Sequence, residues 1–185
     1  HICLDISPKI HANGLPMSEV LRPGKLVTAG KCCVSLGGPV SNTGIALSIL
    51  GQDVALMCKT GDDLFGDIVA RKIKEYGTQE AVAVDSNSDT SYTVALVVPG
   101  YDRIFIHDAG ANNTFAASDI NFDEVAKCKL FHFGYPPLMK QMYRNSGAEL
   151  SEIFKQAKEL GATTSLDMSL PDRASESGQQ DWNAI

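Results

Sequence analysis

The residues whose types and spacing best suit the binding of a polar ligand lie in the segment 37–51. Two adjacent glycines, Gly37 and Gly38, allow positive φ angles or a close approach of the backbone to a ligand, because neither carries a Cβ atom. Ser41 or Asn42 is predicted to cap the helix that follows, and Gly51 to end it. Free N–H groups at such a helix start attract hydroxyls or anions. The alternative interpretation is a capped turn between a strand and a core helix.

A second group of polar residues lies in the segment 61–66, where Asp62 and Asp63 are predicted to begin a helix whose dipole stabilises their charges. No third ligand with suitable spacing accompanies them, so no metal site is predicted. The phosphate loops G-x-x-x-x-G-K-[ST] and G-x-G-x-x-G and the nucleophile elbow G-x-S-x-G are absent from the sequence. His11, His107 and His132 are isolated from one another, and we interpret each as structural rather than catalytic.

The bulk properties limit the class of protein. A length of 185 residues predicts one domain, or one domain with a small appendage. A net charge of -6 and a pI near 5.1 argue against binding to nucleic acid. No apolar run approaches the ~20 residues that a membrane span requires, and the basic residues form no membrane-binding patch. The five cysteines form no C-x-x-C pair, so we expect buried reduced thiols in a cytoplasmic protein.

Strand and helix patterns alternate along most of the chain. The elements that they predict must position the polar residues of segments 37–51 and 61–66. The segment 146–160 begins with a predicted capping box of Ser146 and Glu149. Helices are predicted over 64–76 and 146–160, and strands over 53–59, 80–84, 129–133 and 162–167. This alternation predicts βαβ crossovers and a mostly parallel sheet covered by helices.

Two segments break the alternation. The runs 92–98 and 103–107 flank a turn at 99–102 and predict a β-hairpin, and 24–36 has the pattern of extended structure. We expect them to form a small antiparallel sheet beside the main domain, which serves as a lid, a dimer interface or both. Both ends of the chain are interpreted as cuts, because residue 1 begins inside a strand pattern and 181–185 begin a helix pattern.

Taken together, these features resemble the N-terminal portion of the ribokinase-like (PfkB) family of carbohydrate and nucleoside kinases. The order and spacing of the matching residues fit the family pattern across essentially the whole chain. The matching residues are Asp5 after the first strand, Gly37-Gly38 with Asn42, Leu50-Gly51, Gly61-x-Asp63-x-Phe65-Gly66, the hairpin with Arg103, and Gly110-Ala111-Asn112.

The resemblance implies an α/β fold: a three-layer α/β/α, Rossmann-like, mostly parallel sheet with a small protruding β-sheet lid. The core is expected to comprise 1–7, 37–91 and 108–185, and the lid 8–36 and 92–107. In this family the acid that matches Asp5 binds substrate hydroxyls, the glycines that match Gly37 and Gly38 contact substrate and hinge the lid, and the amide that matches Asn42 binds a hydroxyl. In the hairpin, Thr93, Ala95 and Phe105 either touch substrate or pack the lid. Of these three, Phe105 is included among the predicted substrate-binding residues.

The resemblance also implies what the chain lacks. The family's D-T-x-G-A-G-D motif is absent, and the one N-x-x-E spacing of the chain, at 121–124, lies outside the C-terminal half in which the family carries its Mg²⁺ motif. The catalytic base, an aspartate, is therefore expected beyond Ile185, and ATP and Mg²⁺ are expected to bind mainly to that missing half. We interpret the intact protein as an ATP-dependent sugar or nucleoside kinase, and expect the fragment alone to be inactive. The alternative is a non-catalytic sugar-binding or regulatory module. A nucleotide-dependent oxidoreductase ranks last, because no glycine-rich loop follows the first strand.

Two residues depart from the family pattern. Pro39 stands where some sugar kinases carry a lysine, and Gly134 stands where ribokinases place a substrate-binding glutamate. Both departures put ribose in doubt, so pentose, hexose, sugar phosphate and nucleoside all stay open as substrates. The apolar hairpin favours a homodimer formed through the lid.

Overall fold

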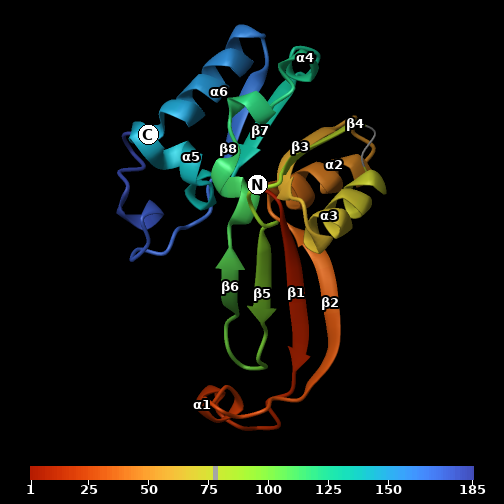
Figure 1. Ribbon diagram of the computed structural model, residues 1–185, viewed down its shortest axis with the longest axis vertical. Coiled ribbons are helices and arrows are strands. Elements are labelled where there is room, and N and C mark those ends of the chain that lie inside the picture. The colour runs from red at the N-terminus through yellow and green to blue at the C-terminus, as the bar shows by residue number, and fades with distance from the viewer. Residues whose placement is uncertain (77–78) are drawn as a thin grey trace.

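The computed structural model describes residues 1–76 and 79–185, and it divides in space into a helix-covered upper part and a long, narrow sheet that projects below it (Figure 1). The projecting sheet has the strand order β2-β1-β5-β6. Its strands are β1 (Cys3–Ile10), β2 (Ala29–Gly37), β5 (Tyr92–Leu96) and β6 (Ile104–Asp108). β2 and β6 run antiparallel to their neighbours, whereas β1 and β5 pair in parallel.

The upper part is built from two βαβ units. β3 (Ala55–Gly61), α3 (Leu64–Lys74) and β4 (Gln79–Asp85) form one unit, with the two strands parallel. β7 (Leu130–Gly134), α6 (Ala148–Glu159) and β8 (Thr163–Asp167) form the other, also with parallel strands. The short helices are α1 (Met17–Val20), α2 (Ala46–Ile49), α4 (Phe122–Val125) and α5 (Lys140–Tyr143). The predicted alternation of strand and helix is therefore confirmed.

Both long helices bury the apolar residues that their spacing places on one face. Val69 and Ile73 of α3 are fully buried in a cluster with Ile2 and Leu4 from the start of β1 and its approach. On α6, Ile153 is fully buried in a second cluster, which also contains Phe133 of β7. Within the described residues, no helix is long and apolar enough to span a membrane.

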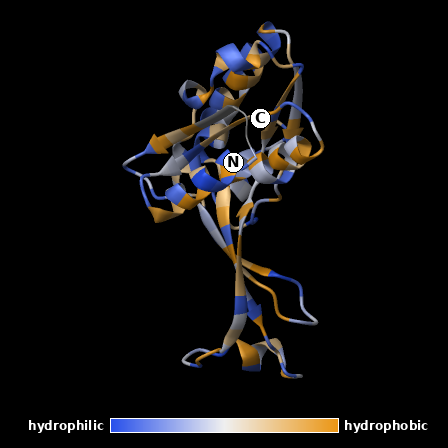
Figure 2. Ribbon diagram, turned by 90° about the vertical axis from the view of Figure 1, so that its right-hand side faces the viewer, coloured by the Kyte–Doolittle hydropathy of each residue, from blue (hydrophilic) through white to orange (hydrophobic). Residues whose placement is uncertain are grey.

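β1 connects the upper part to the tip of the projecting sheet. Leu4, near its beginning, belongs to the core cluster, whereas Ile10 at its end packs with Val20 and Val98 in a separate cluster at the tip. The sheet carries apolar residues along its length, as the hydropathy colouring shows (Figure 2). The predicted hairpin and the extended structure of 24–36 thus correspond to β5–β6 and β2, and the boundaries assigned to core and lid stay a prediction.

Three local predictions were wrong. Neither Ser41 nor Asn42 caps the helical turn Val40–Ile45, because Pro39 precedes it in helical conformation and the Ser41 hydroxyl instead donates to the Leu36 carbonyl at 3.2 Å. The Ser146–Glu149 capping box does not form. α6 begins after Gly147, Ser146 has a φ of 54°, and the Glu149 carboxylate accepts from the backbone N–H of Ala117 at 2.7 Å.

The third wrong prediction concerns the thiols. Cys3 and Cys58 are buried as expected, but Cys32 and Cys33 are exposed on β2, and Cys128 is partly exposed. Cys32 and Cys33 belong to an edge strand of the projecting sheet, where apolar sequence does not require burial on both faces.

Candidate functional site

The register of the projecting sheet brings polar residues from four strands onto one face. Asp5 of β1 lies opposite Ser35 of β2 and Thr93 of β5, and Thr93 lies opposite His107 of β6. Because side chains alternate between the faces of a strand, registered neighbours share a face. We call this the site face; its residues are Cys3, Asp5, Ser7, Cys33, Ser35, Gly37, Thr93, Ala95, Phe105 and His107.

Asp5 and Gly37 are in direct contact at the base of this face. A Cβ atom at Gly37 would lie 2.6 Å from Asp5 Oδ1 and closer still to Oδ2. Any other residue at position 37 would therefore push the carboxylate away. The structure thus brings together the predicted acid and the first of the predicted glycines, and the reason for glycine at position 37 is the space that the Asp5 carboxylate occupies.

Gly38 makes the turn that leads out of the sheet. Its φ of +82° is in the left-handed region, and a Cβ atom there would lie 2.7 Å from the carbonyl oxygen of His1. The Gly38 carbonyl accepts from the backbone N–H groups of Ser41 at 3.1 Å and Asn42 at 2.8 Å. The backbone of Asn42 is therefore tied to the second glycine, while its side chain is exposed on the helical turn Val40–Ile45.

Phe105 shares the site face with Asp5 but lies further toward the tip. It pairs with Ala95, two residues beyond the pair of Thr93 and His107. The ring is 55% exposed, and the Arg103 guanidinium lies 5.3 Å from its centroid. Among the described residues, no hydrogen bond joins the side chain of Asn42 to that of Asp5, whereas the Asp5 carboxylate packs against the Gly37 backbone.

Cys3 and His107, to which the sequence assigned no place in the site, are linked to Asp5 through hydrogen bonds that include Thr93. The Cys3 thiol lies 3.2 Å from Asp5 Oδ1, and the Thr93 hydroxyl lies 3.6 Å from Cys3 Sγ. His107 Nδ1 lies 2.9 Å from Thr93 Oγ1. Burial and the nearby Asp5 charge raise the pKa of Cys3 to about 12, whereas burial lowers the pKa of His107 below its usual value. The two-residue alternation along β1 was the sequence signal that places Cys3 beside Asp5.

The segment Gly110–Thr114 holds the backbone just before β1, the strand that carries Asp5. Asn112 is buried, and its side chain holds residue 2: Oδ1 accepts from the Ile2 N–H at 3.2 Å, and Nδ2 donates to the Ile2 carbonyl at 2.8 Å. Gly110 approaches the backbone of Asp89 so closely that a Cβ atom would collide with it. This part of the matching pattern therefore positions the start of β1.

The two departures from the family pattern contact each other. A Cβ atom at Gly134 would collide with the ring of Pro39, and both residues are buried. Pro39 thus fills the volume that a side chain at position 134 needs. Pro39 and Gly134 form one apolar contact beside the Gly38 turn.

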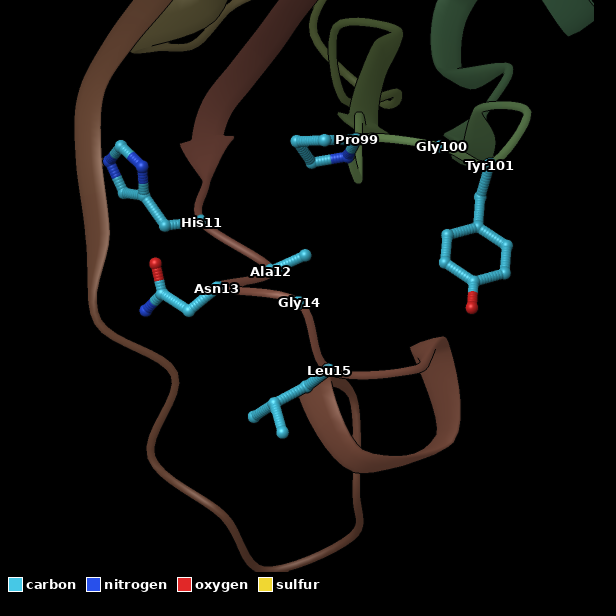
Figure 3. Close-up of a pocket in the computed structure, with 8 residues that line it drawn as sticks. All are labelled: His11, Ala12, Asn13, Gly14, Leu15, Pro99, Gly100 and Tyr101. Atoms are coloured by element: carbon cyan, nitrogen blue, oxygen red, sulfur yellow. The ribbon is translucent and has the colours of Figure 1, made fainter.

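Two cavities lie away from Asp5. One, of about 460 Å³, is at the tip, where His11 to Leu15 face Pro99 to Tyr101 (Figure 3). His11 follows Asp5 by six residues of extended chain, roughly 20 Å, so this cavity is separate from the site. The other, of about 630 Å³, separates β3 from β7 in the core and is lined mainly by apolar residues. The described residues contain no cluster of three or more His, Cys, Asp or Glu that could hold a metal ion.

Comparison with known proteins gives a consistent result. The pfkB family carbohydrate kinase domain matches residues 10–182 of the chain. "Probable fructokinase-4" of Arabidopsis thaliana is 30% identical over 137 residues, which cover 72% of this chain and 41% of the relative. "Probable fructokinase-3" of the same plant is 28% identical over 170 residues, which cover 90% of this chain and 45% of the relative.

The fold matches solved structures over nearly the whole chain. The ribokinase of Giardia lamblia superposes with a TM-score of 0.75 at 18% identity, covering 99% of this chain and 56% of that protein. A fructokinase from Xylella fastidiosa with bound ATP gives a TM-score of 0.67 at 18% identity, covering 100% of this chain and 56% of that protein. The ribokinase-like fold is therefore confirmed. The chain spans less than half the length of the curated relatives it matches.

Proposed function

Since this chain belongs to the pfkB family of carbohydrate kinases, we propose that it supplies the sugar-binding side of an enzyme that transfers the γ-phosphate of ATP to a sugar hydroxyl. The observation that supports this most is the contact of Asp5 with Gly37 on the site face. It leaves a partly exposed carboxylate at the base of the projecting sheet. A carboxylate accepts hydrogen bonds from hydroxyl groups and so can orient a sugar.

The other predicted residues would complete the binding surface. The Asn42 side chain both donates and accepts hydrogen bonds, and it follows directly on the Gly38 turn. The exposed Phe105 ring offers an apolar surface further along the same face. In place of the family's lysine and glutamate, Pro39 and Gly134 provide no polar group. We take D-fructose as the first substrate to test, because several curated relatives are named fructokinases.

Among the described residues, no group of three or more histidine, cysteine, aspartate or glutamate side chains is placed to hold a metal ion. We therefore assign none of them to the metal or to ATP. In our proposal, Mg²⁺, ATP and the catalytic aspartate bind or lie mainly beyond Ile185. The residues of this chain bind and orient the acceptor sugar, and the projecting sheet excludes water from it.

We also propose that the face of the projecting sheet opposite to Asp5 pairs with a second copy of the protein. We call it the outer face; it carries Ile6, Val34, Val94, Ile104 and Ile106. Val34 is 42% exposed and Ile106 is 53% exposed. An apolar sheet face with this exposure favours association through a shared surface.

The substitution Asp5→Asn in the full-length protein tests the proposed function. We expect binding of D-fructose, measured by calorimetry, to weaken about 10- to 100-fold, since hydrogen bonds to a charged group are lost. Asp53→Asn makes the same charge change at an exposed position just before β3, and its binding should match the unsubstituted protein. The 185-residue chain alone should produce no sugar phosphate from ATP. Unchanged affinity of the Asp5 variant would remove Asp5 from the site. Sugar binding by the full-length protein without phosphorylation would favour a non-catalytic binding module.

A further inference from the structure

We propose that Cys3 is a positioning residue for Asp5, and that Thr93 and His107 act through it to fix the direction in which the carboxylate faces the sugar. This inference rests on the proposed function. It adds three residues, from β1, β5 and β6, to which the sequence assigned no role in orienting the carboxylate. Their contacts form one connected path across the site face, from His107 through Thr93 and Cys3 to Asp5.

The path ends on one carboxylate oxygen. Cys3 Sγ lies 3.2 Å from Asp5 Oδ1, and among the described residues this is the one side-chain hydrogen bond that Asp5 makes. The backbone of Gly37, the registered partner of Cys3, also packs against the carboxylate and leaves no room for a side chain. Asp5 therefore contacts both a thiol and a glycine backbone, and Oδ2, which makes no hydrogen bond among the described residues, stays available to accept from a ligand hydroxyl.

The direction of each hydrogen bond in the path follows from which of the two groups carries the proton. Burial and the Asp5 charge raise the pKa of Cys3 to about 12, so near neutral pH the thiol keeps its proton and donates it to the carboxylate. The Thr93 hydroxyl has one proton, which it donates to Cys3 Sγ. When the imidazole is neutral, Thr93 Oγ1 then accepts from the His107 tautomer that has its proton on Nδ1.

The surroundings of His107 agree with this tautomer. Its Nε2 atom is buried and has no hydrogen-bond partner among the described residues, which costs less free energy for a neutral ring than for a charged one. Burial lowers the pKa of the imidazole and so favours the neutral form. The ring of His1 packs at 5.6 Å from that of His107 and, on its other side, at 5.7 Å from that of Tyr135. The path thus runs from a neutral imidazole to the charged carboxylate, with each group donating toward Asp5.

Substitutions at Cys3 in the full-length protein test the inference, with D-fructose and D-ribose as probes. Cys3→Ala removes the donor, and we expect KM for the sugar to rise about 5- to 10-fold while kcat changes little, because one hydrogen bond to a charged group is lost. Cys3→Ser keeps a donor and should return KM to within about twofold of the unsubstituted value. Thr93→Val leaves the thiol in place but removes the group that orders it, so its KM should fall between the two.

Cys58→Ala is the matched control. Cys58 is as buried as Cys3 but lies on β3 in the core cluster, away from Asp5. Both alanine variants should lower the melting temperature through lost packing, but Cys58→Ala should leave KM unchanged. Equal KM values for Cys3→Ala and Cys58→Ala, or failure of Cys3→Ser to restore KM, would overturn the positioning role while the enzyme stays active. A full-length protein that neither binds nor phosphorylates any sugar would overturn the proposed function, and the positioning role with it.

Discussion

At the scale of single residues, the Asp5 carboxylate occupies the volume that a side chain at position 37 would need, so Asp5 and Gly37 depend on each other. The Gly37 backbone has no left-handed φ angle, so its conformation does not demand glycine. Glycine is required at position 37 because the Asp5 carboxylate fills the volume where a Cβ atom would stand. A resemblance between sequences identifies both positions, but the structure supplies the reason why one requires the other.

A double-mutant cycle tests this dependence. Gly37→Ala should lower the free energy of unfolding by about 1–3 kcal/mol, the usual cost of overpacking. In an Asp5→Ala background the same substitution should cost much less, because the carboxylate that it displaces is gone. Urea unfolding of the four proteins gives the coupling energy. Equal costs in both backgrounds would show that Gly37 is required for another reason.

At the scale of elements, the predictions from periodicity were confirmed and two predictions of helix starts were wrong. The apolar spacing of α3 and α6 is repeated over several turns, so the prediction of these helices does not depend on any single residue. A cap depends on one residue's backbone angles. Pro39 starts its helical turn in helical conformation, and the left-handed Gly147 starts α6 in place of the predicted Ser146. The role of Cys3 was missed for a different reason: the sequence pattern of a thiol in an apolar strand is the same for a core residue and for a residue that contacts the site.

The cap of α3 is the predicted one that formed. Asp63 accepts from the backbone N–H of Gly66 at 2.8 Å and from that of Thr90 at 2.7 Å. It therefore fastens the helix start to the chain between β4 and β5. Burial tends to raise its pKa, but these N–H donors outweigh burial and bring the pKa below its usual 3.8.

Asp63→Ala should lower the free energy of unfolding by about 2 kcal/mol near neutral pH, at the upper end for a lost cap because two N–H groups lose their acceptor. The contribution of Asp63 is full above pH 3.8 and disappears as the pH falls below that value through the lowered pKa. Urea unfolding at several pH values measures it. Asp62→Ala, at an exposed position with no hydrogen bond among the described residues, is the control. An equal loss in both variants would contradict the role of the cap.

At the scale of the whole molecule, the two faces of the projecting sheet have opposite characters. The site face carries Asp5, Thr93 and His107, whereas the outer face is aliphatic. One sheet can therefore present one face to a ligand and the other to a second protein chain. On the outer face, Val34, Ile104 and Ile106 are each at least 40% exposed.

The double substitution Val34→Asp, Ile106→Asp should convert the full-length protein from dimer to monomer, because burying unpaired carboxylates costs several kcal/mol each. Sedimentation velocity over a range of protein concentrations measures the change. Ile49→Asp places a charge at an exposed apolar residue of α2 in the upper part, and should leave the dimer intact. If the unsubstituted protein is monomeric at every concentration, or if the double variant stays dimeric, association does not use the outer face.

The continuity of β1 bears on how such a molecule moves. One strand has Leu4 in the core cluster near its beginning, carries Asp5, and has Ile10 in the separate cluster at the tip. Its neighbour β2 ends at Gly37, directly before the left-handed Gly38, but β1 has no glycine of its own. Displacement of the tip must therefore bend and twist a strand that holds the acid itself.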